Sequence, residues 1–189
     1  MKKFVIFSVV FLSLILAPIL FTILSPVLLF SKDNVIREFE KNFNTRLPKS
    51  TVSEKIYDDY AGFHNDGMKL YKFVFTAKGK KSFVSYIEKQ KNWKKLPLSQ
   101  AYQALIYGGE IKDFFGNVTG FGGFAKEVDL PKISKGFWKA IGDRSVITAR
   151  FIDYENLDTK TLINIKSFDF YLAIYDTEKG VLYMLKVNT

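Results

Sequence analysis

The sequence predicts an α+β fold, in which an N-terminal transmembrane helix is followed by one domain with an antiparallel sheet covered on one face by helices. Three observations predict this fold. Residues 4–30 carry no charged side chain. Amphipathic helical patterns come early in the remaining chain, and strand patterns dominate its last third. Near the C-terminus, Thr177-Glu178-Lys179-Gly180 connects two alternating apolar runs, which is typical of a β-hairpin.

The apolar run at residues 4–30 is long enough to cross a membrane. As a straight helix it would measure about 40 Å, against a hydrocarbon thickness of about 30 Å. A cleaved signal peptide has a shorter apolar region of roughly 7–15 residues and a small-x-small cleavage site, whereas this run ends in Leu28-Leu29-Phe30-Ser31. We therefore expect an uncleaved anchor at residues 4–30, which leaves residues 31–189 as a single domain.

The charges that flank the anchor predict its orientation. Lys2 and Lys3 precede it, so the positive-inside rule places residues 1–3 in the cytoplasm and the domain outside it. Lys32, Arg37 and Lys41 follow the anchor and weaken this bias. The expected location is the cell membrane, crossed once.

The composition narrows the class of partner. The chain has a net charge of +9, of which +7 remains outside the anchor once Lys2 and Lys3 are set aside. An outward-facing basic domain meets anionic lipid headgroups, an anionic envelope polymer or a protein partner, and we expect no nucleic acid. Scattered solvated lysines are the alternative explanation. The chain has no cysteine, which excludes disulfides, a lipid-modified cysteine and cysteine-ligated metals, and we expect no metal and no cofactor.

The pattern of apolar residues predicts the elements of the domain. Three helices are expected, from Asn34 to about Arg46, from about Lys80 to Lys91, and after a Ser99 cap. In the second helix we expect Phe83, Val84, Tyr86 and Ile87 to be buried. Strands are expected at Val52–Tyr60, Met68–Thr76, Gly136–Ile141, Val146–Tyr154, Phe168–Asp176 and Val181–Val187.

The glycine-rich segment from Gly108 to Gly123 is interpreted as an irregular loop. It lacks both phosphate-binding patterns, G-x-x-x-x-G-K-[ST] and G-x-G-x-x-G. Its aromatic residues Phe114, Phe115 and Phe121 make it a candidate partner-binding loop. The alternative is that these rings fold back onto the core of the domain.

His64 is the single histidine of the chain and lies in the turn-rich segment Ala61–Gly67 beside Asp66. These two residues are the candidate catalytic pair, because a histidine with a nearby acid can act as a general base. Asp58 and Asp59 are further candidate acids, although their spacing fixes no carboxylate pair. The competing interpretation is that Asn65-Asp66-Gly67 forms a turn that His64 helps to fix.

Three segments carry a resemblance to known proteins. They are Tyr60–Gly67 with the aromatic strand after it, Trp93–Leu98, and Phe170–Asp176 with Leu182-Tyr183. Over most of its length after the anchor, the chain resembles small bacterial proteins that are exported or anchored by an N-terminal hydrophobic segment. Those proteins have no assigned activity, so the resemblance implies an envelope context and no catalytic residue.

Three functions are compatible with this sequence. The first is a membrane-tethered, outward-facing, non-catalytic binding or accessory domain of the bacterial envelope. The second is a small envelope hydrolase that uses His64 with a nearby acid. The third is an immunity-type protein that intercepts a toxin at the membrane.

Overall fold

The computed structural model describes residues 34–60, 66–112, 118–142, 165 and 167–189. The predicted anchor at residues 4–30, His64 and the predicted strand at Val146–Tyr154 lie outside these residues. The chain divides into two compact units, Met1–Glu38 and Phe39–Thr189, and the description below concerns the second. Among the described residues, no helix combines the length and the apolar character needed to cross a bilayer.

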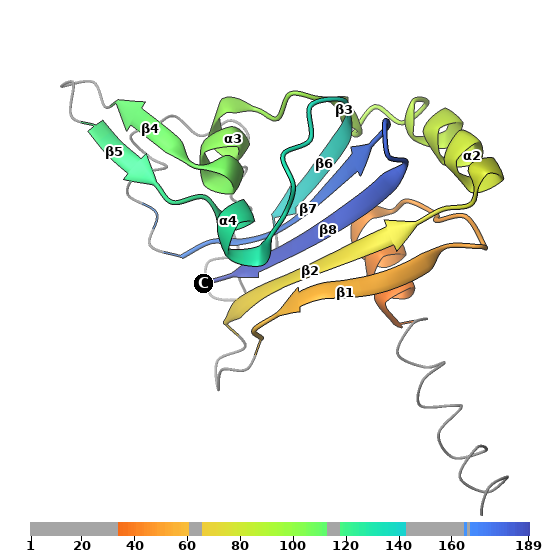
Figure 1. The fold of residues 1–189 in the computed structure, drawn as a ribbon, viewed down its shortest axis with the longest axis horizontal. Coiled ribbons are helices and arrows are strands. Elements are labelled where there is room, and N and C mark those ends of the chain that lie inside the picture. Colours follow the sequence, from red (N-terminus) through yellow and green to blue (C-terminus); the bar gives the residue numbers. More distant parts are fainter. Residues whose placement is uncertain (1–33, 61–65, 113–117, 143–164, 166) are drawn as a thin grey trace, which may run out of the picture. The chain divides into compact units, whose positions relative to one another are not determined.

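A six-stranded antiparallel sheet forms the centre of the second unit, with the strand order β1-β2-β8-β7-β6-β3 (Figure 1). Its strands are β1 (Val52–Asp58), β2 (Gly67–Val74), β3 (Lys94–Lys95), β6 (Gly136–Gly142), β7 (Asp169–Asp176) and β8 (Val181–Asn188). The predicted α+β class and the antiparallel sheet are confirmed. Five predicted strands are found with ends that agree with the prediction to within two residues, and the short β3 was not predicted.

The helices begin and end where capping residues stand. In α2 (Ala77–Ile87), Thr76 caps the first turn by accepting from the Gly79 amide, so the helix starts three residues before the predicted position. Ser99 caps α3 (Gln100–Tyr107), as predicted. The first helix covers residues 34–43 and ends before Arg46. It ends there because Asn44 adopts a left-handed φ of 44° and the Thr45 amide then reaches the Glu40 carbonyl, the bond of a Schellman cap.

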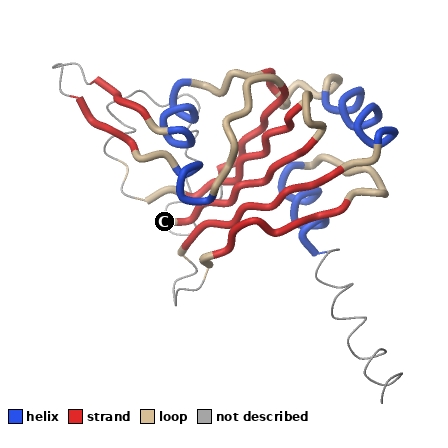
Figure 2. The backbone as a smooth tube through the Cα atoms, in the orientation of Figure 1, coloured by secondary structure: helices blue, strands red, loops and turns tan. Residues whose placement is uncertain are grey.

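Helices cover both faces of the sheet, whereas the sequence predicted cover on one face (Figure 2). On one face, α3 and α4 (Phe124–Val128) pack in a single hydrophobic cluster with Leu172 and Ile174 of β7. On the other face, rings from the first helix and from α2 contact the sheet, in the pairs Phe39–Phe73, Phe43–Tyr171 and Phe83–Tyr175. The reason is β7, which is buried at every position from Phe170 to Asp176 and so has no polar face to turn toward water.

The glycine-rich segment contains a hairpin, so its interpretation as an irregular loop is wrong. Strands β4 (Gly109–Lys112) and β5 (Val118–Phe121) pair antiparallel in a sheet of their own. Glycines allow the sharp bends at its base, since a Cβ on Gly123, whose φ is 77°, would lie 2.4 Å from the Gly108 nitrogen. Glycine content obscured a strand pair here, because it lowers strand propensity without preventing pairing.

The predicted C-terminal hairpin is confirmed. The Asp176 carboxylate accepts from the Glu178 and Lys179 amides, each at 2.9 Å, and thereby shapes the turn between β7 and β8. Gly180 completes the turn with a φ of 63°, and its amide donates to the Asp176 carbonyl at 2.8 Å.

A buried polar network closes the C-terminal end of the first helix. The Lys139 Nζ of β6 donates to the Phe43 carbonyl, which also accepts from the Thr45 hydroxyl at 2.9 Å. The Trp93 indole nitrogen then donates to the Thr45 hydroxyl oxygen at 3.1 Å. The lysine charge suits this position, because the C-terminal end of a helix carries negative partial charge. Lys139 is only 6% exposed, and burial lowers the pKa of its ammonium below the ordinary 10.5.

The lowered pKa of Lys139 predicts a pH-dependent contribution to stability. Between the folded pKa and 10.5 the unfolded chain binds more protons than the folded chain, so the free energy of unfolding gains from Lys139 as pH rises. We expect Lys139→Met to lose this gain, so that the stability of the variant relative to wild type declines as the pH rises from the folded pKa toward 10.5. The measurement is urea unfolding of the full chain in mild detergent. Lys132→Met, at an exposed position, is the matched control, and its free energy of unfolding should change with pH in parallel with that of wild type. If the free energy of unfolding of Lys139→Met changed with pH in parallel with that of wild type, the pH-dependent contribution of Lys139 would be refuted.

Candidate functional site

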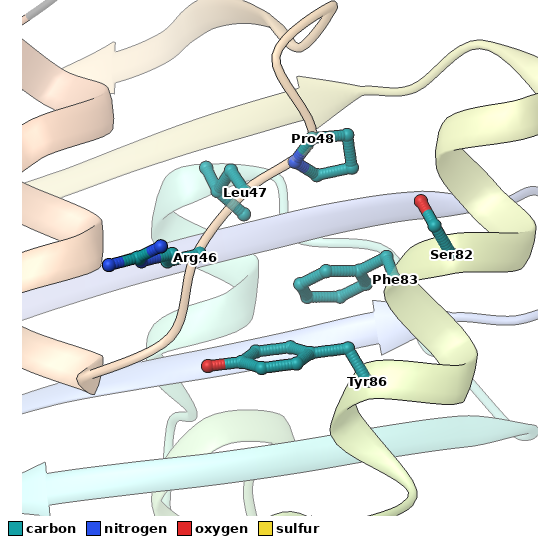
Figure 3. Close-up of a pocket in the computed structure, with 6 residues that line it drawn as sticks. All are labelled: Arg46, Leu47, Pro48, Ser82, Phe83 and Tyr86. Atoms are coloured by element: carbon teal, nitrogen blue, oxygen red, sulfur yellow. The ribbon is translucent and has the colours of Figure 1, made fainter.

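A cleft opens between α2 and the segment that follows the first helix. Its volume is about 190 Å³. Six residues line it, namely Arg46, Leu47, Pro48, Ser82, Phe83 and Tyr86 (Figure 3). The first three come from one wall and the last three from α2, so the cleft joins residues that are far apart in the chain.

The floor of the cleft is apolar and firmly held. Leu47 is 8% exposed and Phe83 is 1% exposed. The Phe83 ring contacts the rings of Phe75, Tyr175 and Trp93, with centroid distances of 4.9, 5.2 and 5.9 Å. The floor is therefore part of the hydrophobic core, and its shape does not depend on a ligand.

The rim of the cleft is polar and aromatic. Arg46, Ser82 and Tyr86 are all exposed, and in Figure 3 the rings of Phe83 and Tyr86 project from α2 toward the wall that carries Arg46. Tyr86 is 37% exposed, which corrects the expectation that it is buried with Phe83. The Ser82 hydroxyl donates to the Gly79 carbonyl at 3.0 Å and keeps its oxygen as an acceptor.

Hydrogen bonds hold the wall opposite α2 in place. The Leu47 amide donates to the Glu40 carboxylate at 2.8 Å, and the Pro48 carbonyl accepts from both the amide and the hydroxyl of Thr51. Gly79 lets this wall approach α2, because a Cβ there would lie only 3.2 Å from the Pro48 Cβ. The cleft is thus a fixed feature of the two elements that form it.

Cations surround the cleft. Lys49 follows the lining residue Pro48, and the helical spacing of α2 places Lys78 one turn before Ser82. Lys89 lies in the turn directly after α2, where its amide donates to the Tyr86 carbonyl. All three are exposed, and no acidic residue lines the cleft. Two acids stand nearby, namely Glu40, whose carboxylate accepts from the Leu47 amide, and exposed Glu88. With Arg46, the cations outnumber these acids, so the local potential favours an anionic ligand.

The cleft does not have the make-up of a catalytic or metal centre. None of its six lining residues is a histidine, aspartate or glutamate, so Ser82 has no base within the lining. In the part of the chain that the structure describes, no group of three or more metal-ligating side chains comes together. Its volume is also below the roughly 300–1,000 Å³ of small-molecule pockets.

Of the residues predicted for catalysis, the described acids lie where β1 ends and β2 begins. His64 is outside the described residues, and Asp66 is exposed just before β2. Asp59 is held by its own hairpin, since one of its oxygens accepts from the Met68 amide and the other from the Tyr57 hydroxyl at 3.1 Å. The structure therefore assigns Asp59 a structural role, and the pairing of His64 with Asp66 stays a prediction.

Asp58 lies in a cluster of cations and tyrosines beside this hairpin. Burial alone would raise the pKa of Asp58, but hydrogen bonds from Lys55 and the Tyr60 amide, with the charge of Lys69, lower it below the usual value. A carboxyl with a lowered pKa stays ionised and is a poor general acid at neutral pH. The Lys69 and Lys186 ammonium groups each lie 4.7 Å from the centre of the Tyr60 ring, a cation–π arrangement.

The predicted partner-binding loop is described only in part. Phe114 and Phe115 lie outside the described residues. Phe121 ends β5, where its backbone pairs with Gly109. The role of these three aromatic residues in binding stays a prediction.

The sequence did not reveal the cleft, because its two walls are more than thirty residues apart. The exposure of Tyr86 could be anticipated in part from α2. Tyr86 lies three residues after Phe83, a spacing that places it beside the buried stripe of the helix but at its margin.

Comparison with known proteins returned no match. No protein-family model, curated protein or solved structure matches this chain.

The floor and the rim of the cleft should respond differently to truncation. We expect Phe83→Ala to lower the free energy of unfolding by about 3–5 kcal/mol, because it removes a buried ring that touches three others. Tyr86→Ala, at the exposed rim, should change it by less than about 1 kcal/mol. Denaturant unfolding of the full chain measures both. Equal losses in the two variants would show that Tyr86 belongs to the core and that the cleft is not open.

Proposed function

We propose that this protein is a membrane-tethered, outward-facing, non-catalytic binding domain of the bacterial envelope, and that the cleft between α2 and the Arg46–Pro48 segment contacts a protein partner. The observation that carries the proposal is the cleft itself. An apolar floor beneath an exposed aromatic rim is the arrangement found at binding hot spots, where one side chain of a partner is desolvated.

The distribution of polar groups favours binding over hydrolysis. At the cleft, a serine hydroxyl has no acid or histidine among the lining residues. At the β1–β2 hairpin, the carboxylates of Asp58 and Asp59 are engaged by neighbouring lysines, amides and Tyr57. A hydrolase needs a histidine or a carboxylate that is free to exchange a proton, and these two acids serve the local structure instead.

The membrane location rests on the sequence. The uncharged run at residues 4–30 and the preceding Lys2 and Lys3 support a single span with the N-terminus in the cytoplasm. The resemblance to small anchored or exported bacterial proteins supports the same envelope location. An immunity-type protein would be one case of this function, with a toxin as the partner.

Cysteine labelling tests the proposed topology cleanly, because the chain has no cysteine of its own. We expect Lys132→Cys, at an exposed position of the domain, to react with a membrane-impermeant maleimide in intact bacterial spheroplasts. Lys3→Cys should react only after the membrane is opened. The readout is a mass shift of the full-length chain. The reverse pattern, or a chain shortened before residue 33 and released to the medium, would refute the tethered, outward-facing arrangement.

Site-specific photo-crosslinking tests the proposed binding surface. A photoreactive phenylalanine analogue at Tyr86 should give a discrete protein adduct in intact cells, because this side chain stands at the rim of the cleft. The same analogue at exposed Gln100 of α3 is the control position and should give none. Adding Ser82→Trp, which fills the cleft, should abolish the Tyr86 adduct. Adducts of equal yield at both positions, or an adduct that survives Ser82→Trp, would count against the cleft as the binding site.

A further inference from the structure

We propose that the cleft receives an acidic protein segment that inserts one bulky apolar side chain between α2 and the Arg46–Pro48 wall. This inference rests on the proposed binding function and specifies the chemistry of the partner. Three features of the cleft support this inference. They are its size, the exposed Arg46 at its rim and the lysines near it.

The size of the cleft selects a single side chain. A buried apolar cavity of about 150 Å³ in another protein accommodates a benzene molecule. The volume of about 190 Å³ here therefore suits one phenylalanine- or leucine-sized group, placed over Leu47 and Phe83. A longer ligand would have to extend along the surface beyond the cleft.

Arg46 supplies a specific contact beside the inserted group. Its side chain is exposed at the rim, and it takes part in no ion pair among the described residues. A guanidinium binds a carboxylate through two parallel N–H donors, so an aspartate or glutamate next to the apolar anchor would satisfy it. The hydroxyl groups of Ser82 and Tyr86 offer further polar contacts at the same rim.

The surrounding lysines extend this preference for acidic chains. Lys49, Lys78 and Lys89 are exposed and form no ion pair within the described residues. By contrast, Lys55, Lys69, Lys72 and Lys135 are paired with acids. Exposed lysines without an ion pair also occur elsewhere among the described residues, for example Lys126 and Lys132. Near the cleft, Lys49, Lys78 and Lys89 add to the charge of Arg46, and together they complement a segment with several acidic residues.

An acidic protein segment fits these features better than other polyanions of the envelope. A poly(glycerol phosphate) chain has no bulky apolar group for the floor formed by Leu47 and Phe83. A lipid acyl chain is much longer than a cleft that holds one ring. Only a polypeptide combines a compact apolar side chain with carboxylates at neighbouring positions.

Peptide binding to the full chain in phosphatidylcholine nanodiscs tests the inference. The probe is a fluorescent short peptide with one phenylalanine flanked by glutamates, followed by fluorescence anisotropy. Replacing the phenylalanine by serine should weaken binding about tenfold, since that ring is buried on binding. Replacing the glutamates by glutamine should weaken it at least as much. Raising the salt from about 50 mM to about 500 mM should also weaken it, because exposed charges are screened.

Variants of the protein locate the binding. Arg46→Glu and Tyr86→Ala should each reduce affinity about tenfold, as expected for the loss of a central contact. Lys132→Glu makes the same change of charge outside the cleft and should reduce affinity no more than about twofold. Thermal unfolding of each variant confirms that it is folded. An equal effect of Arg46→Glu and Lys132→Glu would overturn the inference, because the attraction would then be nonspecific.

Two further probes separate the alternatives. Phosphatidylglycerol vesicles and poly(glycerol phosphate) are presented to the same variants. If either binds in an Arg46-dependent manner while the acidic peptide does not, the inference is wrong and the cleft region recognises that polyanion. If the peptide fails while the Tyr86 crosslink in cells persists, the proposed binding function stands and only the partner chemistry is wrong. If both fail, the proposed function fails as well.

Discussion

The two-sided burial of β7 is the constraint on which the rest of the structure depends. Every residue from Phe170 to Asp176 is buried, so both faces of the sheet require an apolar cover. One helix layer cannot supply it. On one face, Leu172 and Ile174 pack in a cluster with α3 and α4. On the other face, Tyr171 contacts the first helix and Tyr175 contacts α2. A chain of this size thereby builds three layers around one central strand.

The second layer also creates the cleft that we propose as a binding surface. The helix α2 presents Phe83 to Tyr175 and Trp93, and this orientation leaves Tyr86 at the rim of the cleft, where it is 37% exposed. The opposite wall follows the cap of the first helix, where Lys139 and the Thr45 hydroxyl donate to the Phe43 carbonyl and the Trp93 indole donates to the Thr45 hydroxyl. The cleft is therefore preorganised by interactions that stabilise the fold, and a ligand does not have to order it.

Charge is organised differently at the two ends of the domain. Around the β1–β2 hairpin, Asp58 is paired with Lys55 and Lys69, and this local compensation weakens the field available to a ligand. Around the cleft, Arg46 and the nearby lysines have no such compensation among the described residues. The charge near the cleft is therefore less compensated than the charge around Asp58, and it can attract an anionic partner.

The sequence by itself determined the elements whose signals are local. The positions of five strands, the turn of Thr177–Gly180 and the Ser99 cap depend on residues close in the chain, and the structure confirms them. The apolar run at residues 4–30 is local in the same sense, and its membrane span remains a prediction from sequence. The tertiary structure alone decided what depends on distant contacts, namely the helices on both faces, the hairpin at β4 and β5, and the cleft between Arg46 and Tyr86. The physical reason is that burial and pairing are settled by which segments meet, and periodicity along one segment does not specify its neighbour.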